Sequence, residues 1–388
     1  MCLLCVDTVA LLNSRCDPTM PRMFFNRRVR PSVFVTVLLW WWSVGVQACA
    51  ICAPSDAQNT VVQRLFAADR IVLAQMDADG VHARAVAAMR GVMPEFVIAV
   101  AGTLPGVEPQ RARLASDPHL LVFNSGSQTW WIFGHIGVDR LQWLAEATRL
   151  STSRDGTRDA VLARGRFFAQ HLEDPEPLIA LAAYEEISVL PYSTLRLLAK
   201  QVSAASMGIW IENPSLRARL PLYYLLWGFQ TSAEIASAIE VSIAKVNTET
   251  PGPELSAMLA ALLEQRGSPA LDWIEHRFLR DPAVPEGQVQ AALLALSVHG
   301  FDAVKITRDQ VVEAYKRFIA ANPRRAGFVA SDLGSWERWE FAPVFASALE
   351  SAPNQVFASR YSVVFYLLRN PNPEAKSELE RLRSAGLL

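Results

Sequence analysis

Cysteine is scarce and confined to one end of the chain. The 388 residues include five cysteines, and none follows Cys52. If the first 48 residues are removed, as argued below, Cys49 and Cys52 are the only thiols left. They can then form a disulfide only with each other or with another molecule.

Short motifs that carry chemistry are also missing. The sequence contains no G-x-x-x-x-G-K-[ST], G-x-G-x-x-G, H-E-x-x-H or G-x-S-x-G. Phosphate loops, zincin sites and nucleophile elbows therefore have no support. The acidic pairs Glu173-Asp174 and Glu185-Glu186 are interpreted as a helix cap and as the solvated side of a helix, not as carboxylates facing each other across a cleft. We predict no catalytic residue and no cofactor.

The chain has no excess of positive charge of the kind that nucleic-acid binding requires. Its 37 basic and 38 acidic residues give a formal net charge of −1, and removal of residues 1–48, with five arginines and two aspartates, makes it −4. A nucleic-acid binder needs a basic face, so no nucleic-acid partner is expected. A hydrophobic content of 51% excludes wholesale disorder and predicts a globular protein.

The N-terminal segment has the order of a secretory signal. Arg27, Arg28 and Arg30 precede the apolar run 33–42, which leads to small residues near Ala48. The whole apolar run is about 14 residues, shorter than the ~20 that span a bilayer. We predict that residues 1–48 are an upstream extension and signal peptide, that translation starts at Met23, and that the protein is periplasmic or extracellular. The alternative is an uncleaved segment that anchors the chain to the membrane.

Two cleavage positions fit the small-x-small rule, one before Cys49 and one before Ile51. Cleavage before Cys49 leaves a C-x-x-C motif that ends at Cys52. This motif has three interpretations: a local disulfide, a redox pair, or half of a soft-metal site. No strand precedes it, as one does in thioredoxin-type sites. Ala53 stands where c-type haem attachment needs histidine. A disulfide is favoured.

Residues 49–145 are predicted to form a small β-rich domain. A short helix opens it, with caps at residues 54–56 and apolar side chains at helical spacing. Five short strands at close spacing predict a small antiparallel β-barrel or sandwich. The apolar side chains of the helix are Val61, Val62, Leu65 and Phe66. The predicted strands are 70–76, 81–86, 96–101, 119–123 and 129–133.

Histidines fall on three of these strands. His82, His119 and His135 could converge on a metal together with Cys49 and Cys52. The alternative is that they are ordinary surface or half-buried side chains.

The same segment resembles a known type of module. It has a cysteine-containing start, a short helix, a strand entered through Ala67-Ala-Asp-Arg70, a paired strand that reaches Arg90-Gly91, and the strand 120–123. In these features it resembles the netrin-like/tissue-inhibitor type of OB-fold module. The later cysteines that pin such modules are absent. The resemblance therefore implies the fold and no inhibitory or ligand-binding role.

From Arg158 onward the pattern becomes helical, with a recurring junction in which an apolar residue and one further residue precede Asp/Asn-Pro; the junction at Asn322 matches more loosely, with two residues after Ile319. Asp or Asn caps the first turn and Pro needs no donor at the first helical position, so each junction is predicted to end one helix and open the next. The Asp/Asn positions are 39, 68, 41 and 48 residues apart, and the longest gap has room for a further unit around 250–251. These positions are Asp174, Asn213, Asp281, Asn322 and Asn370.

In three features this part of the chain resembles HEAT-type repeats. They are the periods between the caps, the stripes of small and large apolar residues after them, and Arg217 after the second cap. The resemblance implies that residues 158–388 form an α-solenoid of two-helix repeats, joined to the β domain by a polar linker at 146–157. An irregular helical bundle is the alternative. Overall we predict an α+β multidomain chain.

Solenoids present long surfaces and rarely carry chemistry. We therefore expect an exported, non-enzymatic binding or scaffolding protein with a protein or peptide partner, which touches a membrane only through an uncleaved signal. Trp336 and Trp339 lie on one helical face, either as core or as an exposed aromatic patch that binds a peptide or glycan. The alternative function is redox or metal handling through Cys49 and Cys52.

Overall fold

The computed structural model describes most of the chain after residue 50. All described residues belong to one unit, Gln47–Leu388. The predicted signal peptide, the start at Met23, both cleavage positions and Cys49 lie outside the described residues, which are 51–52, 60–104, 118–124, 127–152, 156–246, 251–302, 304–351 and 356–388.

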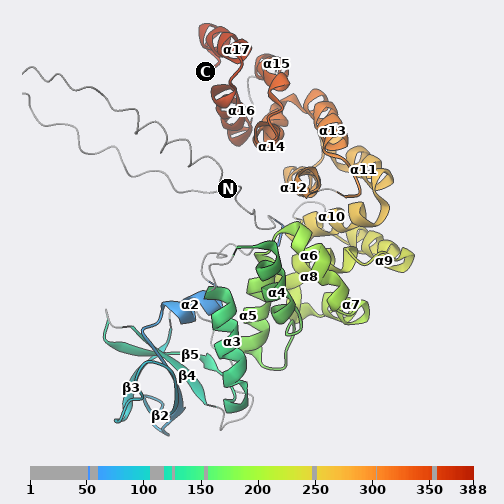
Figure 1. Cartoon of the computed structure of the whole chain (residues 1–388). Helices are drawn as coiled ribbons and strands as arrows, with labels where there is room; N and C mark the ends of the chain where they lie inside the picture. Colours follow the sequence, from blue (N-terminus) through green and yellow to red (C-terminus); the bar gives the residue numbers. More distant parts are fainter. Residues whose placement is uncertain are drawn as a thin grey trace, which may run out of the picture. The chain divides into compact units, whose positions relative to one another are not determined.

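A small mixed sheet comes first in this unit (Figure 1). Strand β1 pairs with both β2 and β4, so the hydrogen-bonded order β1-β2-β3-β5-β4 returns to its first strand. The bounds are β1 Arg70–Met76, β2 His82–Arg90, β3 Ile98–Thr103, β4 His119–Asn124 and β5 Thr129–His135. The predicted strands are all present, and β1 has the predicted bounds.

The prediction of an antiparallel sheet is wrong at one pairing. Strands β3 and β5 run parallel, with Val100 beside Trp130 and Thr103 beside Ile132. The chain crosses over after β3 so that β4 pairs antiparallel to β1, and the β4–β5 hairpin then returns β5 in the direction of β3. Alternation of apolar and polar residues reveals a strand but not its direction.

The sheet buries side chains on both of its faces. One set packs only within the sheet, and the other joins the hydrophobic core that continues through the helices. Strand β1 contributes to both, because Val72 and Ala74 belong to the first set and Ile71 and Leu73 to the second. Sheet and helices therefore share one core.

Two helices flank the sheet in sequence. Helix α2, Val61–Ala67, is capped by a reciprocal capping box between Thr60 and Gln63, so its cap is not at the predicted residues 54–56. Helix α3, Leu141–Thr152, buries Leu144 and Ala147 and contacts α2. The predicted linker 146–157 is therefore wrong in its first half, which is helix.

The carboxylates of Glu185 and Glu186 accept hydrogen bonds from the start of α2. Oγ1 of Thr60 donates to Glu186 at 2.8 Å, and the backbone N–H of Val61 donates to Glu185 at 2.5 Å. Glu186 is only 3% exposed, and it also accepts from Ser151 Oγ at 2.9 Å. The expectation of a solvated face is thus wrong. A helix N-terminus has unpaired N–H groups and a partial positive charge, which carboxylates satisfy.

Helices fill the rest of the chain (Figure 1). Many of the α-helices are separated by short 3₁₀ turns, and one turn is π-helical. The bounds are α4 Arg158–Ala169, α5 Pro177–Ser188, α6 Tyr192–Leu198, η4 Ala199–Gln201, α7 Ala204–Ile211, η5 Pro214–Arg219, α8 Leu220–Gly228, α9 Ala233–Ala244, α10 Glu254–Arg266, α11 Ser268–Ile274, η6 Glu275–Leu279, α12 Glu286–Asp302, α13 Arg308–Ala321, η7 Pro323–Val329, α14 Ala330–Ser335, η8 Trp339–Phe341, α15 Ala342–Ser351, α16 Phe357–Arg369 and α17 Pro373–Ser384; a further 3₁₀ turn, η3 Val138–Arg140, precedes α3.

The Asp/Asn-Pro junctions are turns, and two of them also start a helical segment. Asn213 caps η5 and Asn322 precedes η7, each with Pro at the first position, as predicted. At the other three the next helix begins later, at Pro177, at Glu286 after Pro285, or at Pro373. Four of the five side chains accept a hydrogen bond from the amide two residues on, namely those of Asp174, Asn213, Asp281 and Asn370.

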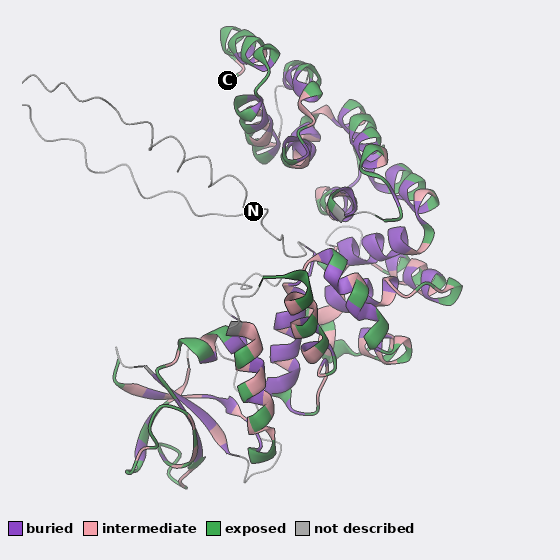
Figure 2. Ribbon diagram, viewed as in Figure 1, coloured by how far each residue is buried: buried purple, intermediate pink, exposed green. Residues whose placement is uncertain are grey.

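Helix α10 lies at the centre of the helical part. It contacts α8, α9, α11 and α12, and the run Leu255–Glu264 is buried throughout (Figure 2). A Cβ atom on Gly228 of α8 would lie 2.3 Å from Cβ of Ala261, so the two helices approach closely enough to require glycine there. Within the described residues, no helix combines the length and the hydropathy needed to cross a membrane.

Candidate functional site

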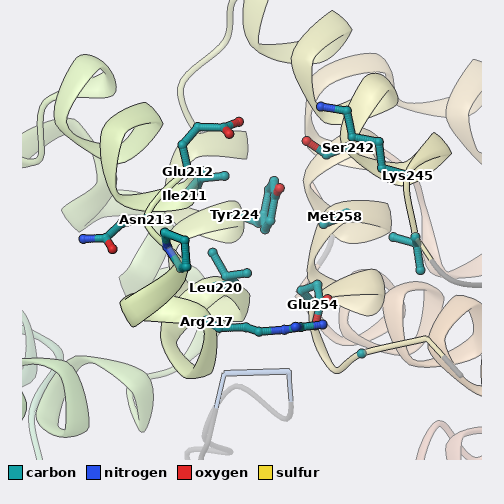
Figure 3. Close-up of a pocket in the computed structure, with 13 residues that line it drawn as sticks. Ile211, Glu212, Asn213, Arg217, Leu220, Tyr224, Ser242, Lys245, Glu254 and Met258 are labelled. Carbon is teal, nitrogen blue, oxygen red and sulfur yellow. The ribbon is translucent and has the colours of Figure 1, made fainter.

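A groove of about 480 Å³ opens between the α7–α8 region and the α9–α10 region (Figure 3). Its lining mixes apolar, hydroxyl, amide and charged side chains. The lining residues are Ile211, Glu212, Asn213, Pro214, Arg217, Leu220, Tyr224, Ser242, Lys245, Val246, Gly252, Glu254 and Met258.

One wall is built by the second Asx-Pro junction. The Asn213 side chain accepts from the Ser215 amide at 3.0 Å and from the Ser215 hydroxyl at 2.8 Å. This local turn starts η5, which carries Arg217. The repeated junction of the sequence thus places a cation at the groove.

Tyr224 forms the floor together with Leu220 and Met258 (Figure 3). Tyr224 is 4% exposed, and burial raises the pKa of its phenol. The nearby carboxylates Glu212 and Glu254 raise that pKa further, whereas a hydrogen bond with Ser242 opposes them. The phenol is therefore neutral at physiological pH and offers a fixed hydroxyl on an apolar base.

The charged side chains are divided between the two ends of the groove. Figure 3 shows Arg217 beside Glu254 at one end, and Glu212 and Lys245 at the other. Within the described residues no ion pair joins these four groups to one another. Each end thus offers one cation and one anion, an arrangement that does not favour a highly charged ligand such as a phosphate.

A second hollow of about 320 Å³ shares Val246 with the groove. It is lined by residues from the end of α9 and by Trp273, Arg277 and Phe278 around the π-helical turn η6. Trp273 is 42% exposed, and the Arg277 guanidinium lies 5.2 Å from the centre of the Phe278 ring. The last turn of α9 is therefore flanked by hollows that carry aromatic and cationic groups.

No family model, curated protein or solved structure matches this chain. The groove and the hollow beside it are therefore interpreted from their own geometry. The architecture that the structure supports is a helix-rich C-terminal part after a small N-terminal sheet.

Of the two positions expected for Trp336 and Trp339, the core and an exposed aromatic patch, Trp336 takes the core. Trp336 is 7% exposed, and its ring stacks on Tyr315 with centroids 5.7 Å apart. A Cβ on Gly300 would lie 2.3 Å from the Trp336 ring, so the indole fills space that the glycine leaves. Trp336 belongs to the core. Trp339 is half-buried against Tyr366 and lines a small hollow of about 130 Å³.

The predicted metal-site residues are only partly brought together. His119 and His135 meet, whereas His82 lies beside Asp79, with His82 Nδ1 2.5 Å from an Asp79 oxygen. Cys52 is 2% exposed, and Cys49 lies outside the described residues. In the described part of the chain no three His, Cys, Asp or Glu residues form a group that could hold a metal.

Sequence reasoning did not identify the groove. The apolar stripe that includes Tyr224 and the cap followed by Arg217 were visible in the sequence, but both were assigned to repeat packing. The groove exists because α9 and the start of α10 stand opposite them, and no local pattern encodes that approach.

Proposed function

We propose that this is an exported, non-enzymatic binding protein whose helical part holds a short extended peptide in the groove around Tyr224. The observation that carries the proposal is the groove itself, with an apolar, hydroxyl-bearing floor and one charge of each sign at both ends. Its volume of about 480 Å³ is within the ~300–1,000 Å³ of typical ligand sites.

A peptide fits this chemistry better than a compact anion or cation. An extended backbone presents alternating N–H and C=O groups, which hydroxyl and amide side chains such as Tyr224, Ser242 and Asn213 match. Side chains of either charge find a partner at each end. The apolar floor supplies burial for one anchor side chain, which is the usual source of affinity in such sites.

The arrangement of the helices supports a HEAT-type solenoid as the scaffold. Most helices contact the next helix along the chain or the next but one, as α10 contacts α9 and α11 and, more extensively, α8 and α12. The turn at the Asx-Pro junctions recurs with similar hydrogen bonds. Stacked units of this kind build extended binding surfaces.

We infer that the sheet is a closed barrel of the OB type. Its strand order returns from β4 to β1, and its only described parallel pairing is β3 with β5. The adjacent helices α2 and α3 before and after the strands are consistent with the netrin-like resemblance. Because Cys52 is buried, the redox alternative gains no support, since a redox-active thiol must be accessible.

The test is selection of peptides from a random displayed library on the full chain, followed by affinity measurements on groove variants. Tyr224→Phe removes a buried hydroxyl and is expected to weaken a selected peptide about tenfold, the loss typical of one buried polar contact. Lys245→Glu reverses an exposed charge and is expected to weaken it by about two- to fivefold, because exposed charge pairs contribute about 0–1 kcal/mol. Lys200→Glu is the matched control, because Lys200 is also an exposed lysine near a helix end. Selected peptides that bind all four proteins equally would refute the groove as the site.

A further inference from the structure

The β4–β5 hairpin places two histidines directly opposite each other. His119 pairs with His135 in the antiparallel register, so both side chains point to the same face of the sheet. Their Nε2 atoms are 2.7 Å apart, and the ring centres are 4.0 Å apart at an interplanar angle of 57°. Both residues are half-buried.

Two ring nitrogens at this distance can share one proton between them, or can both bind one metal ion that lies to the side of the line joining them. A single proton fills the gap when one imidazole donates to the other. Burial, and after it the neighbouring His135, lower the pKa of His119 to about 4. At neutral pH His119 is therefore uncharged, and neutral imidazole is the form that binds metals.

The separation of the two nitrogens favours a particular coordination geometry. Metal–nitrogen bonds of about 2.0 Å place two ligands ~2.8 Å apart when they are cis in a square plane, and ~3.3 Å apart in a tetrahedron. The observed separation of 2.7 Å is closer to the square-planar value than to the tetrahedral one. Square-planar and tetragonal sites with nitrogen ligands are typical of Cu²⁺ and Ni²⁺.

We propose that His119 and His135 form a two-histidine site that binds Cu²⁺ through their Nε2 atoms in cis positions. Solvent completes the coordination, because the rings are half-exposed and the described residues offer no third protein ligand. The β1 neighbour of His119 is Ala74, whose small side chain leaves the rings room to adjust. The site lies on the sheet and shares no residue with the groove of the helical part, so it does not depend on peptide binding.

The test is electron paramagnetic resonance of the untagged full chain with one equivalent of Cu²⁺. We expect a tetragonal spectrum with hyperfine splitting from two imidazole nitrogens. His119→Gln and His135→Gln should each weaken Cu²⁺ binding at least tenfold, whereas His82→Gln should leave it unchanged. His82 is the matched control because it is an exposed histidine of the same sheet, on β2, which pairs with neither β4 nor β5.

Three results would overturn the proposal: a spectrum dominated by sulfur ligands, an unchanged affinity in both histidine variants, or an equal loss in the His82 variant. A measurement on the unaltered chain guards against misfolded variants. Bound Cu²⁺ should protect His119 and His135, but not His82, from modification by diethyl pyrocarbonate. Equal modification with and without bound copper would also reject the site.

Discussion

The side-chain amide of Asn322 donates a hydrogen bond of 2.7 Å to the backbone carbonyl of Leu279, 43 residues earlier in the chain. Leu279 opens one Asx-Pro junction and Asn322 is the capping position of the next. The same amide also reaches the carbonyl of Phe318 at 3.3 Å. A residue that the sequence marks as a local cap therefore also joins successive units of the helical part.

Replacement of Asn322 by Ala should lower the free energy of unfolding by about 1–3 kcal/mol, because the backbone carbonyl of Leu279 loses the side-chain amide as its donor. Asn322 is 3% exposed, so water does not replace it without rearrangement. Urea unfolding measured by circular dichroism gives the change. Asn213→Ala is the control. It removes the exposed Asn side chain of another junction, which caps its own turn, and the loss should be ~1 kcal/mol or less. Equal losses would show that the junctions act only locally.

A buried polar cluster links three helices around Glu264. Arg196 donates to both oxygens of its carboxylate, and the Tyr192 hydroxyl donates to one of them at 3.1 Å. That hydroxyl also lies 3.2 Å from Nε2 of His299, which is fully buried. Burial lowers the pKa of His299, so the imidazole is neutral and serves as a hydrogen-bonding group.

Arg196→Met should therefore destabilise the protein strongly, by about 3–5 kcal/mol, since it leaves the buried Glu264 carboxylate without its cation. Arg266→Met is the matched control, because the Arg266–Glu240 pair is exposed and such pairs contribute about 0–1 kcal/mol. Differential scanning calorimetry of both variants gives the comparison. If both variants lowered the stability only slightly and by similar amounts, the role assigned to the cluster would be contradicted.

The histidine pair predicts a specific pH dependence of stability. The pKa of His119 is about 4 in the folded protein, below the ordinary histidine value of 6.5 that applies to the unfolded chain. Between these values the unfolded state binds more protons, so the free energy of unfolding falls as the pH is lowered from about 6.5 to 4. The melting temperature should drop between pH 7 and pH 5 by more in the parent chain than in His119→Gln. Parallel curves for the two proteins would contradict this prediction.

The structure shows where local sequence signals suffice and where they do not. Strand β1 was predicted from Arg70 to Met76, because its apolar run ends at the Asp77–Gly80 turn, and both signals are local. The parallel pairing of β3 with β5 was missed, because strand direction depends on a crossover. Glu185 and Glu186 were misinterpreted, since their burial depends on the start of α2, over 120 residues away in sequence.

The candidate site follows the same rule. Arg217 and Tyr224 were visible as a cap-following cation and as part of an apolar stripe, but only the approach of Ser242 and Lys245 turns them into a groove. At Trp336, too, the local pattern did not decide the environment of the side chain. Two indoles at helical spacing were compatible with the core or with an exposed patch, and the space above Gly300 places Trp336 in the core.

The most direct test of the peptide-binding proposal is amide hydrogen exchange of the full chain with and without a peptide selected on it. The account predicts slower exchange in two separate segments, 211–224 and 242–246, together with the start of α10, because these segments line the groove. Exchange in the sheet should be unchanged. Protection confined to the sheet, or to helices that do not line the groove, would contradict the central claim.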